Sequence, residues 1–365
     1  MSLARDIADL GSSATRLDTV GSNIVINGAM NVAQRGTSET GVGASDGYFT
    51  VDRFKIDVDA TSAWRLTMSQ TADGPSGFAN CIKLDCTTAD TSIAAGERLI
   101  LRHIIEGQDL QQLKKGTSDA ESFTISFYVK GNAAATYSLS LYDGDNGRTI
   151  SQTFSVTTSW NRIELTFAGD TTGAFGDDNG ASLFLDIFLH AGSSYTSGTL
   201  GTSWASNDNA TRAVGISSFF DSTDREFFIT GYQMEVGSTA TDFEHRSFGE
   251  ELIRCQRYTY VIAGDDDDMT GIMGYGESAS NARFPFVYPV IMRTSPSFTL
   301  SGTCRAQGGT ADGANFTSGL AIINENTNHT GAALRVTGTS NLANDRGYNL
   351  QIKANGTTLT FDAEL

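Results

Sequence analysis

Acidic side chains are abundant in this sequence and could do chemistry. The 365-residue chain has 42 aspartates and glutamates, and two of them facing each other across a cleft could hydrolyse a glycosidic bond. The sequence contains no serine-hydrolase elbow, zinc-protease helix, phosphate-binding loop or dinucleotide-binding turn. The histidines have no metal-ligand spacing and stand at His103, His190, His245 and His329. We therefore expect a protein that is not an enzyme, has no cofactor or metal, and carries its carboxylates on a solvated surface.

Two acidic clusters are candidates for holding a cation. The first is a run of four like charges, Asp265, Asp266, Asp267 and Asp268. This run either forms an exposed loop tip, which we favour, or gathers divalent ions. The second, DGDNG at 143–147, resembles the start of a calcium loop but lacks glycine at loop position 6 and glutamate at position 12, where Phe154 stands. For 143–147 we expect a hairpin turn.

Four aromatic residues fall on the strand face opposite the expected core rows: Tyr128, Tyr142, Phe184 and Phe188. Such a row is not expected to stay in contact with water without a role. It could stack sugar rings, form a subunit interface, or be covered by the loop 191–213, which is rich in Gly, Ser and Asn and carries Tyr195 and Trp204. We favour burial by this loop or by a neighbouring chain, since two of the four residues are Phe and have no polar group. Tyr195 and Trp204 are the candidate glycan-binding residues of this region.

Alternating apolar and polar residues from Asn23 to Arg246 predict the strands that position these side chains. Residues 123–129, 163–167 and 183–189 each present an apolar row at every second position. Asp-Gly and Asn-Gly pairs separate the strands. About ten such strands predict a jelly-roll β-sandwich over residues 23–246. The other expected elements are strands near 48–58, 64–70, 80–87, 136–142, 148–157 and 226–236, and a helical insert near 106–115.

Residues 2–20 are the one long segment with helical spacing. Its apolar positions are separated by 4, 3, 4 and 3 residues and are Leu3, Ile7, Leu10, Ala14 and Leu17. This spacing is typical of a coiled-coil seam, and a solitary amphipathic helix is the alternative. Burying the seam contributes roughly 6–12 kcal/mol, less than the roughly 16–30 kcal/mol lost in ordering the backbone. We therefore expect residues 1–22 to be the coil of a homotrimer whose β-domains supply most of the contact area.

Residues 247–365 are expected to form a second, smaller β-domain. Ser247 and Glu250 have the spacing of a capping box and predict a short helix that ends near Gln256. Pro285 and Pro289 lack N–H groups on the same side of one strand, which favours an edge strand. The expected fold is thus mainly β, with a short N-terminal coiled-coil helix, a jelly-roll sandwich and a smaller C-terminal β-sandwich.

The candidate receptor surface of the C-terminal domain lies in two expected loops, 264–282 and 305–330. Both are rich in Gly, Asn and Asp and have few large apolar residues. The first loop contains the run Asp265–Asp268 together with Tyr275. The acidity of the two loops favours neutral sugars, basic protein loops or cation-bridged anionic glycans as ligands.

Charge and cysteine content exclude several classes of function. The net charge of −17 disfavours nucleic acid and anionic membrane surfaces as partners. No apolar run reaches 18 residues and the start lacks the apolar core of a secretory signal, so we expect no membrane insertion. Cys81 and Cys86 would lie about 16 Å apart on one strand, too far for a disulfide. We expect free thiols at Cys81, Cys86, Cys255 and Cys304.

Several phrases of the sequence resemble bacteriophage tail-fibre proteins. NIVINGAMNVAQRGTS at 23–38, followed by GYFTVDRFKI at 47–56, resembles the opening of many such proteins. ITGYQMEVGSTATDFEHRSFGEELIRCQRY at 229–258 resembles a last sandwich strand followed by a short helix. FPFVYPVIMRTSPSFTL at 284–300 and the ending TFDAEL are similar to the C-terminal β-domain. The leader at 2–22 resembles the short stalks of fibres in phages of marine bacteria, and 60–220 is similar to the jelly roll of carbohydrate-binding modules.

The resemblance implies a virion appendage that is made in the host cytoplasm, is usually a homotrimer and recognises the host surface. Its partners would be a host glycan or surface protein and, through the N-terminus, another tail or adaptor protein. A structural virion protein, such as a head fibre or capsid decoration, is the alternative. A depolymerase is less favoured, because polysaccharide-degrading tail spikes are usually long β-helices with repeats, which this sequence lacks.

Overall fold

The computed structural model describes residues 23–58, 63–308, 313–323 and 327–365. The chain divides into two compact units, the first ending at Glu251 and the second comprising Leu252–Leu365. The expected boundary lies at residue 247. The expected coiled coil at 3–17 lies outside the described residues. As predicted, the fold is mainly β, and within the described ranges no helix is long and apolar enough to cross a membrane.

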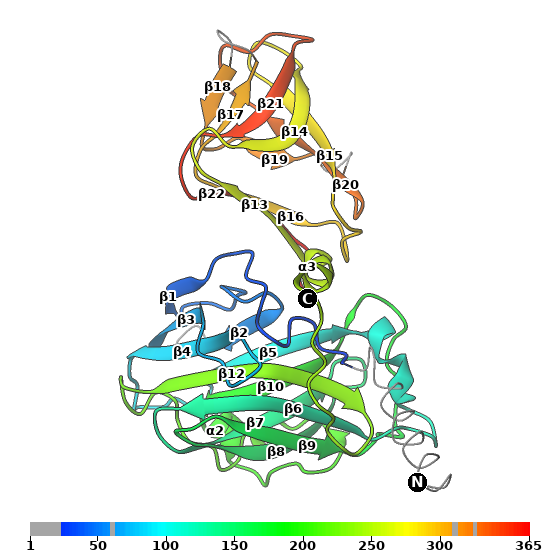
Figure 1. Cartoon of the computed structure of the whole chain (residues 1–365). Coiled ribbons are helices and arrows are strands. Elements are labelled where there is room, and N and C mark those ends of the chain that lie inside the picture. The colour runs from blue at the N-terminus through cyan, green and yellow to red at the C-terminus, as the bar shows by residue number, and fades with distance from the viewer. Residues whose placement is uncertain (1–22, 59–62, 309–312, 324–326) are drawn as a thin grey trace, which may run out of the picture. The chain divides into compact units, whose positions relative to one another are not determined.

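Unit 1 is a sandwich of two antiparallel sheets, each with six strands among the described residues. The strands of the two sheets run in roughly the same direction (Figure 1), the aligned packing of β-sandwiches. The first sheet contains, in spatial order, β1 (Ser38–Val42), β3 (Arg65–Thr71), β4 (Cys81–Thr88), β12 (Glu226–Val236), β6 (Phe123–Gly131) and β9 (Asn161–Phe167). The second contains β11 (Ala205–Ser206), β8 (Arg148–Val156), β7 (Ala135–Asp143), β10 (Ala181–Ala191), β5 (Arg98–Glu106) and β2 (Phe54–Val58).

The core of unit 1 lies between the two sheets. The apolar rows predicted on β6 and β10 face each other there, and Phe127, Val129, Leu183 and Leu185 are fully buried. Each such side chain contributes about 1.5–3 kcal/mol relative to leaving it in water. The sequence analysis missed β5, a central strand, because apolar residues occupy both of its faces and mask the alternation.

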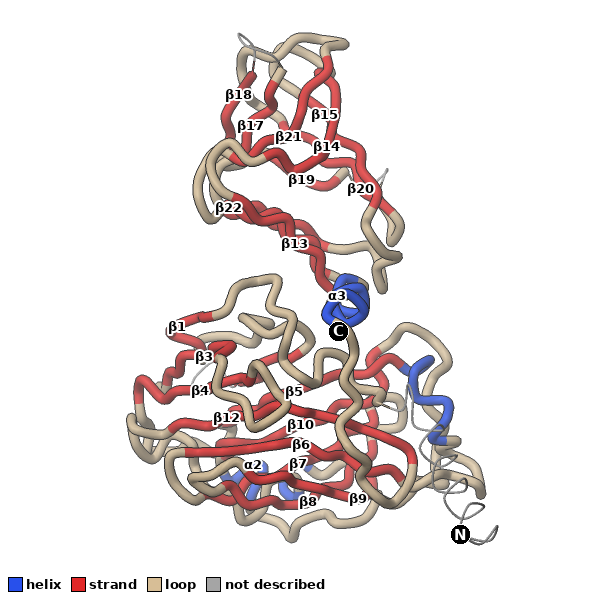
Figure 2. Tube along the Cα trace, viewed as in Figure 1, coloured by secondary structure: helices blue, strands red, loops and turns tan. Residues whose placement is uncertain are grey.

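Among the described residues, helix occurs only in short pieces between the strands, as Figure 2 shows. The insert predicted near 106–115 is a 3₁₀ helix, η1 (Gly107–Leu113), which ends where Lys114 adopts a left-handed conformation at φ 48°. The loop after β10 contains α2 (Ser193–Thr196) and η2 (Asn209–Thr211).

The four outer-face aromatics belong to two different sheets, so the single row expected from the sequence is wrong. Tyr128 lies on β6 of the first sheet and packs against Phe78, with ring centroids 5.3 Å apart. Phe188 lies on β10 of the second sheet and is fully buried beneath Tyr195 and Ala213 of the loop 191–213. Burial by this loop is therefore confirmed for Phe188. Tyr142 and Phe184 are only partly buried.

The cysteines at 81, 86, 255 and 304 are buried and form no disulfide. Cys86 lies in the core. Cys81 is also buried, and its thiol contacts Thr71 and the backbone of Asp73. Burial raises the pKa of Cys86 to about 11 and that of Cys304 to about 12. Neither Cys86 nor Cys304 is therefore a thiolate at neutral pH.

Unit 2 has a three-stranded and a seven-stranded sheet within the part of the chain that the structure describes. The helix α3 (Phe248–Gln256) contains the boundary between the units, and it begins as predicted, with the Ser247 hydroxyl accepting the Glu250 N–H at 3.3 Å. The smaller sheet is β13 (Thr259–Gly264), β22 (Thr357–Asp362) and β16 (Ser297–Ser301). The larger is β18 (Gly313–Phe316), β17 (Cys304–Gln307), β21 (Gly347–Ile352), β14 (Met269–Gly276), β15 (Ala282–Val287), β20 (Gly331–Val336) and β19 (Leu320–Ile322).

Two expectations for unit 2 are corrected. Pro285 lies in β15, which is an inner strand rather than an edge strand. The proline is tolerated because β15 pairs with β14 only at Ala282 and Arg283, so the strand is locally open on that side at Pro285. The expected loops 264–282 and 305–330 contain four strands, β14, β17, β18 and β19.

Candidate functional site

A pocket of about 280 Å³ lies on the outer face of the second sheet of unit 1, where the loop after β10 meets the strands. We call it the arginine pocket. Its floor comes from β2, β5, β7 and β10, and its wall from the loop. It is lined by Asp57, Arg98, Ile100, Arg102, Tyr142, Phe184, Tyr195, Asn207, Asn209 and Arg212.

Strand register brings the charged residues of the floor together. Arg102 on β5 lies directly opposite Asp186 on β10, and Lys55 on β2 lies on the other side of Arg102. Residues opposite each other in an antiparallel pair point to the same face, so these side chains share the outer face of the sheet. Asp57 reaches the same group from β2.

Arg102 holds the centre of an ion-pair network. Its Nε and Nη2 donate to the two carboxylate oxygens of Asp186 at 2.6 and 2.9 Å, and its Nη1 donates to Asp57 Oδ2 at 2.6 Å. The bidentate geometry fixes the guanidinium plane as well as its position. The guanidinium group of Arg102 is therefore already held in a fixed orientation in the pocket before a ligand binds.

Arg98 and Arg212 flank this centre. Arg98 donates from Nε to Asp57 Oδ1 at 2.6 Å and from Nη1 to the Tyr195 hydroxyl at 3.0 Å. Arg212 donates from Nη2 to Asp186 Oδ2 at 2.6 Å and from Nε to Ser140 Oγ at 3.0 Å. Arg98 Nη2 and Arg212 Nη1 have no hydrogen-bond partner among the described residues, so both remain as donors for a ligand.

The pocket is locally cationic in a strongly acidic chain. The three guanidinium groups outnumber the two carboxylates, Asp57 and Asp186, by one. Burial raises the pKa of Asp186, but the charges and hydrogen bonds of Arg102 and Arg212 outweigh burial and hold that pKa below its ordinary value. Burial lowers the pKa of Arg102, and Asp186 and Asp57 more than reverse this effect. Asp186 and Arg102 are therefore both charged at neutral pH.

Aromatic faces lie beside the charged groups. The rings of Tyr142 and Phe184, opposite each other on β7 and β10, have centroids 5.5 Å apart and are partly exposed. The Arg102 guanidinium lies 5.3 Å from the Phe184 centroid, and that of Arg212 lies 5.5 Å from the Tyr142 centroid. These contacts help to fix the arginines and leave flat apolar surface at the pocket.

This arrangement suits binding better than catalysis. A glycosidase acid needs a carboxyl group with a raised pKa, whereas the pKa of Asp186 is lowered. Both oxygens of Asp57 and of Asp186 accept hydrogen bonds from arginine. Fixed cationic donors, amides and exposed ring faces can hold a polar ring that carries a negative group.

The structure separates the two aromatics predicted in the loop 191–213. Tyr195 lines the arginine pocket, and its hydroxyl accepts a hydrogen bond from Arg98 Nη1. Trp204 is not among the residues lining it. Its indole Nε1 donates to the Ala168 carbonyl at 2.8 Å, and its ring packs against the core.

A second buried charge network lies near Trp204. The Lys115 ammonium contacts Asp143 Oδ2 at 2.6 Å, Asp170 Oδ2 at 3.2 Å, and the carbonyls of Thr172 and Gly173 at 2.8 and 2.7 Å. Residues 143–147 connect β7 and β8, so the predicted hairpin turn is confirmed. An oxygen cage that would suit a cation is thus filled by a side chain of the protein itself.

The predicted site residues of unit 2 do not form one site. Asp265–Asp268 are an exposed turn, as favoured from the sequence. The Lys353 ammonium pairs with Asp266 at 2.9 Å and also with Asp267. Within the described ranges, no cluster of three or more potential metal ligands occurs. Tyr275 lies half-exposed on β14 and lines a separate hollow with Pro285 and Phe286.

Sequence reasoning missed the arginines of the pocket and their aspartates. A signal was present, because Arg102 and Asp186 each interrupt an apolar strand segment, LILRHII and LFLDIFL. A charged residue inside such a run requires a partner of opposite charge. The register that pairs these two could not be read from the sequence.

No protein-family model matches the sequence, and no curated protein is similar to it at the sequence level. Similar solved structures include the enzymatically active domain of bacteriophage CBA120 tailspike protein 4. The two sequences are 14% identical, the match covers 59% of this chain and 21% of that chain, and the TM-score is 0.31. TmCBM61, solved with β-1,4-galactotriose, has 8% identity, covers 59% of this chain and 99% of its own, and gives a TM-score of 0.30. The CBM22-1 xylan-binding domain from Paenibacillus barcinonensis Xyn10C has 14% identity, 55% and 99% coverage, and a TM-score of 0.27. The match thus spans about a fifth of the tailspike chain, and likenesses this low assign neither a family nor a ligand.

Proposed function

We propose that this chain binds a saccharide bearing an acidic group, and that the arginine pocket is its binding site. The observation that carries the proposal is the pair of uncommitted donors, Arg98 Nη2 and Arg212 Nη1, beside the partly exposed rings of Tyr142 and Phe184. A sugar ring presents C–H groups to an aromatic face and hydroxyl groups to neighbouring donors. A carboxylate on the ring pairs with guanidinium groups.

The rigidity of the pocket supports this ligand class. Its volume of about 280 Å³ lies just below the usual range of small-ligand sites, which begins at about 300 Å³. The arginines are already oriented by Asp57 and Asp186. Ordering them on binding therefore costs little entropy.

We further propose that the binding serves attachment rather than catalysis, on a phage tail fibre. The support is the order of the sequence phrases at 23–38, 47–56, 229–258 and 284–300. In this proposal the protein is located on the virion as a homotrimer held by residues 3–17, with another tail or adaptor protein at the N-terminus. Sedimentation of the full chain and of Leu10→Asp tests the trimer: a stable wild-type monomer would exclude it.

The direct test of the pocket is a pair of tyrosine variants. Tyr142→Leu removes a ring that lines the pocket, while Tyr128→Leu removes another partly buried ring from the outer face of the other sheet. Titration calorimetry would use oligosaccharides that contain glucuronate, galacturonate or sialate. For an oligosaccharide of this set that binds the wild type, we expect Tyr142→Leu to lower the affinity by about tenfold, about 1.4 kcal/mol. Tyr128→Leu should leave the affinity unchanged. Equal affinities of the two variants would refute the assignment.

The attachment role has its own test. Phage particles that carry Tyr142→Leu fibres should adsorb to host cells more slowly than particles that carry Tyr128→Leu fibres. Adsorption at the wild-type rate by both would favour the alternative of a structural virion protein without a receptor role.

A further inference from the structure

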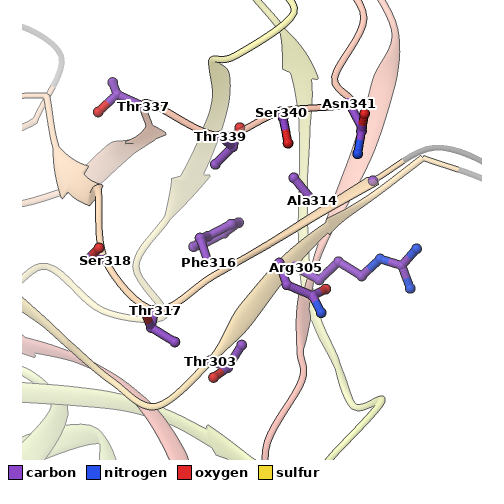
Figure 3. A pocket seen from close by; sticks show the side chains of 13 residues that line it. Thr303, Arg305, Ala314, Phe316, Thr317, Ser318, Thr337, Thr339, Ser340 and Asn341 are labelled. Atoms are coloured by element: carbon purple, nitrogen blue, oxygen red, sulfur yellow. The ribbon is translucent and has the colours of Figure 1, made fainter.

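A hollow of unit 2 has a composition unlike that of the arginine pocket. It measures about 720 Å³ and lies between the strands β17 and β18 and the connection that follows β20. Figure 3 shows Phe316 in its middle, with Thr303, Thr317 and Thr339 around it, while the Arg305 side chain extends away from Phe316. We call this the neutral hollow. Its lining is Thr303, Arg305, Gly313, Ala314, Asn315, Phe316, Thr317, Ser318, Thr337, Gly338, Thr339, Ser340 and Asn341.

Hydroxyl and amide groups dominate the neutral hollow. Eight of its thirteen lining residues are Ser, Thr or Asn, and none is acidic although the chain has 42 acidic residues. Most of these polar side chains are exposed and make no hydrogen bond to another described residue. They are Asn315, Thr317, Ser318, Thr337, Ser340 and Asn341.

The backbone adds further free groups. All four residues of β18 line the hollow, and among the described strands β18 is an end strand of its sheet that pairs only with β17. The N–H and C=O groups on its open edge therefore need partners from water or from a ligand. Gly338 has a φ of 73° and open space where a Cβ would stand, so a ligand can approach the backbone closely there.

We propose that the neutral hollow is a second binding site and that it takes an uncharged oligosaccharide. Such a ligand presents many hydroxyl groups, each both donor and acceptor, which match side chains of the same kind. A charged ligand has little to pair with, because Arg305 is the one charged residue among those that line the hollow. The argument uses no residue of the arginine pocket and holds whether or not that pocket binds a sugar.

An added peptide strand is the competing occupant of a free strand edge. The lining disfavours it, because β18 offers only four residues and the only apolar side chains, Ala314 and Phe316, are buried in the core. Alternate side chains of a peptide would find no apolar pocket, whereas a sugar chain needs none.

The test uses exposed asparagines, whose replacement leaves the core intact. The doubly substituted chain Asn315→Ala with Asn341→Ala removes two amides from the hollow. Its matched control is Asn344→Ala, an exposed asparagine of the same connection that contacts Asp345 and does not line the hollow. Ser340→Trp is a third variant that fills the space with a large side chain.

The probes are uncharged hexasaccharides of glucose, galactose, xylose and N-acetylglucosamine, titrated into the full chain and followed by amide NMR and calorimetry. We expect at least one to bind, with affinity lower by about tenfold in the double variant, lower still in Ser340→Trp, and unchanged in Asn344→Ala and in Tyr142→Leu. Absence of binding by every probe, or loss of binding in Tyr142→Leu alone, would overturn the proposal. So would a result in which polar peptides, but no sugar, shift the amides of residues 313–316.

Discussion

The arginine pocket of unit 1 and the neutral hollow of unit 2 are built on different parts of a β-sheet. The pocket lies on the face of central strands, where buried Asp186 is shared by Arg102 and Arg212. The hollow lies at an end strand and a connection, and its exposed amides and hydroxyls have no partners among the described residues. Binding groups on central strands are therefore coupled to the stability of the fold, whereas binding groups at an edge can be changed without affecting it.

The largest expected effect is the loss of stability of unit 1 when the buried ion pairs of Lys115 are broken. Lys115→Met leaves Asp143 as a buried carboxylate without its cation, whereas Asp170 keeps its pair with Arg148. Breaking a buried ion pair costs about 3–5 kcal/mol. Denaturant unfolding should show this loss in the transition of unit 1 and no change in that of unit 2.

The matched control for this prediction is the neighbouring lysine. Lys114 pairs with Glu121 on the surface, and both side chains are largely exposed. Lys114→Met should leave unfolding unchanged, because exposed pairs contribute little. Equal destabilisation by the two substitutions would contradict the role given to burial.

Acid should destabilise unit 1 in a window that starts well above the pKa of its carboxylates. Burial lowers the pKa of His190 from 6.5 to about 4. The unfolded chain therefore takes up a proton near pH 6.5 while the folded chain does not, so stability is complete above pH 6.5 and falls as the pH drops toward 4. The free energy of unfolding of unit 1 falls by about 3 kcal/mol over this range.

Unfolding measured across this pH range tests the effect. His190→Gln should remove that part of the pH dependence, and His329→Gln, which replaces an exposed histidine of unit 2, should leave it in place. A pH profile of unit 1 that is the same in both variants would show that another group carries the dependence.

Salt should separate the two binding sites. Raising the ionic strength from 0.1 to 1 M shortens the screening length from about 10 Å to about 3 Å. An acidic saccharide in the arginine pocket should then bind about threefold more weakly, because charge attracts it. An uncharged oligosaccharide in the neutral hollow should keep its affinity. Parallel calorimetric titrations at the two ionic strengths measure both, and equal salt dependence would remove the distinction.

The smallest effect is expected at the acidic turn of unit 2. Lys353 already pairs with Asp266 and Asp267. Added calcium should therefore not shift the thermal transition of unit 2. A stabilisation that grows with calcium concentration, and that disappears in Asp266→Asn, would revive the cation site that the sequence left open.

The alternation of apolar residues was enough to predict the sandwich and its inward rows on β6 and β10. It failed at β5, whose outward Ile100 is covered by the loop after β10 and therefore breaks the period of two. Tyr195 was predicted because an aromatic residue in a Gly-rich loop stands out. The partners of Arg102 could not be predicted, since they depend on which strands pair and in what register.

The central claim is that the guanidinium groups of the arginine pocket recognise an acidic group on a sugar. The most direct measurement compares the affinity of the wild-type chain for an acidic oligosaccharide that binds and for the same oligosaccharide with its carboxyl groups reduced to alcohols. We predict that reduction weakens binding by about tenfold or more, and that Arg98→Gln removes most of this difference. Equal affinity for the acidic and the reduced sugar would contradict the claim.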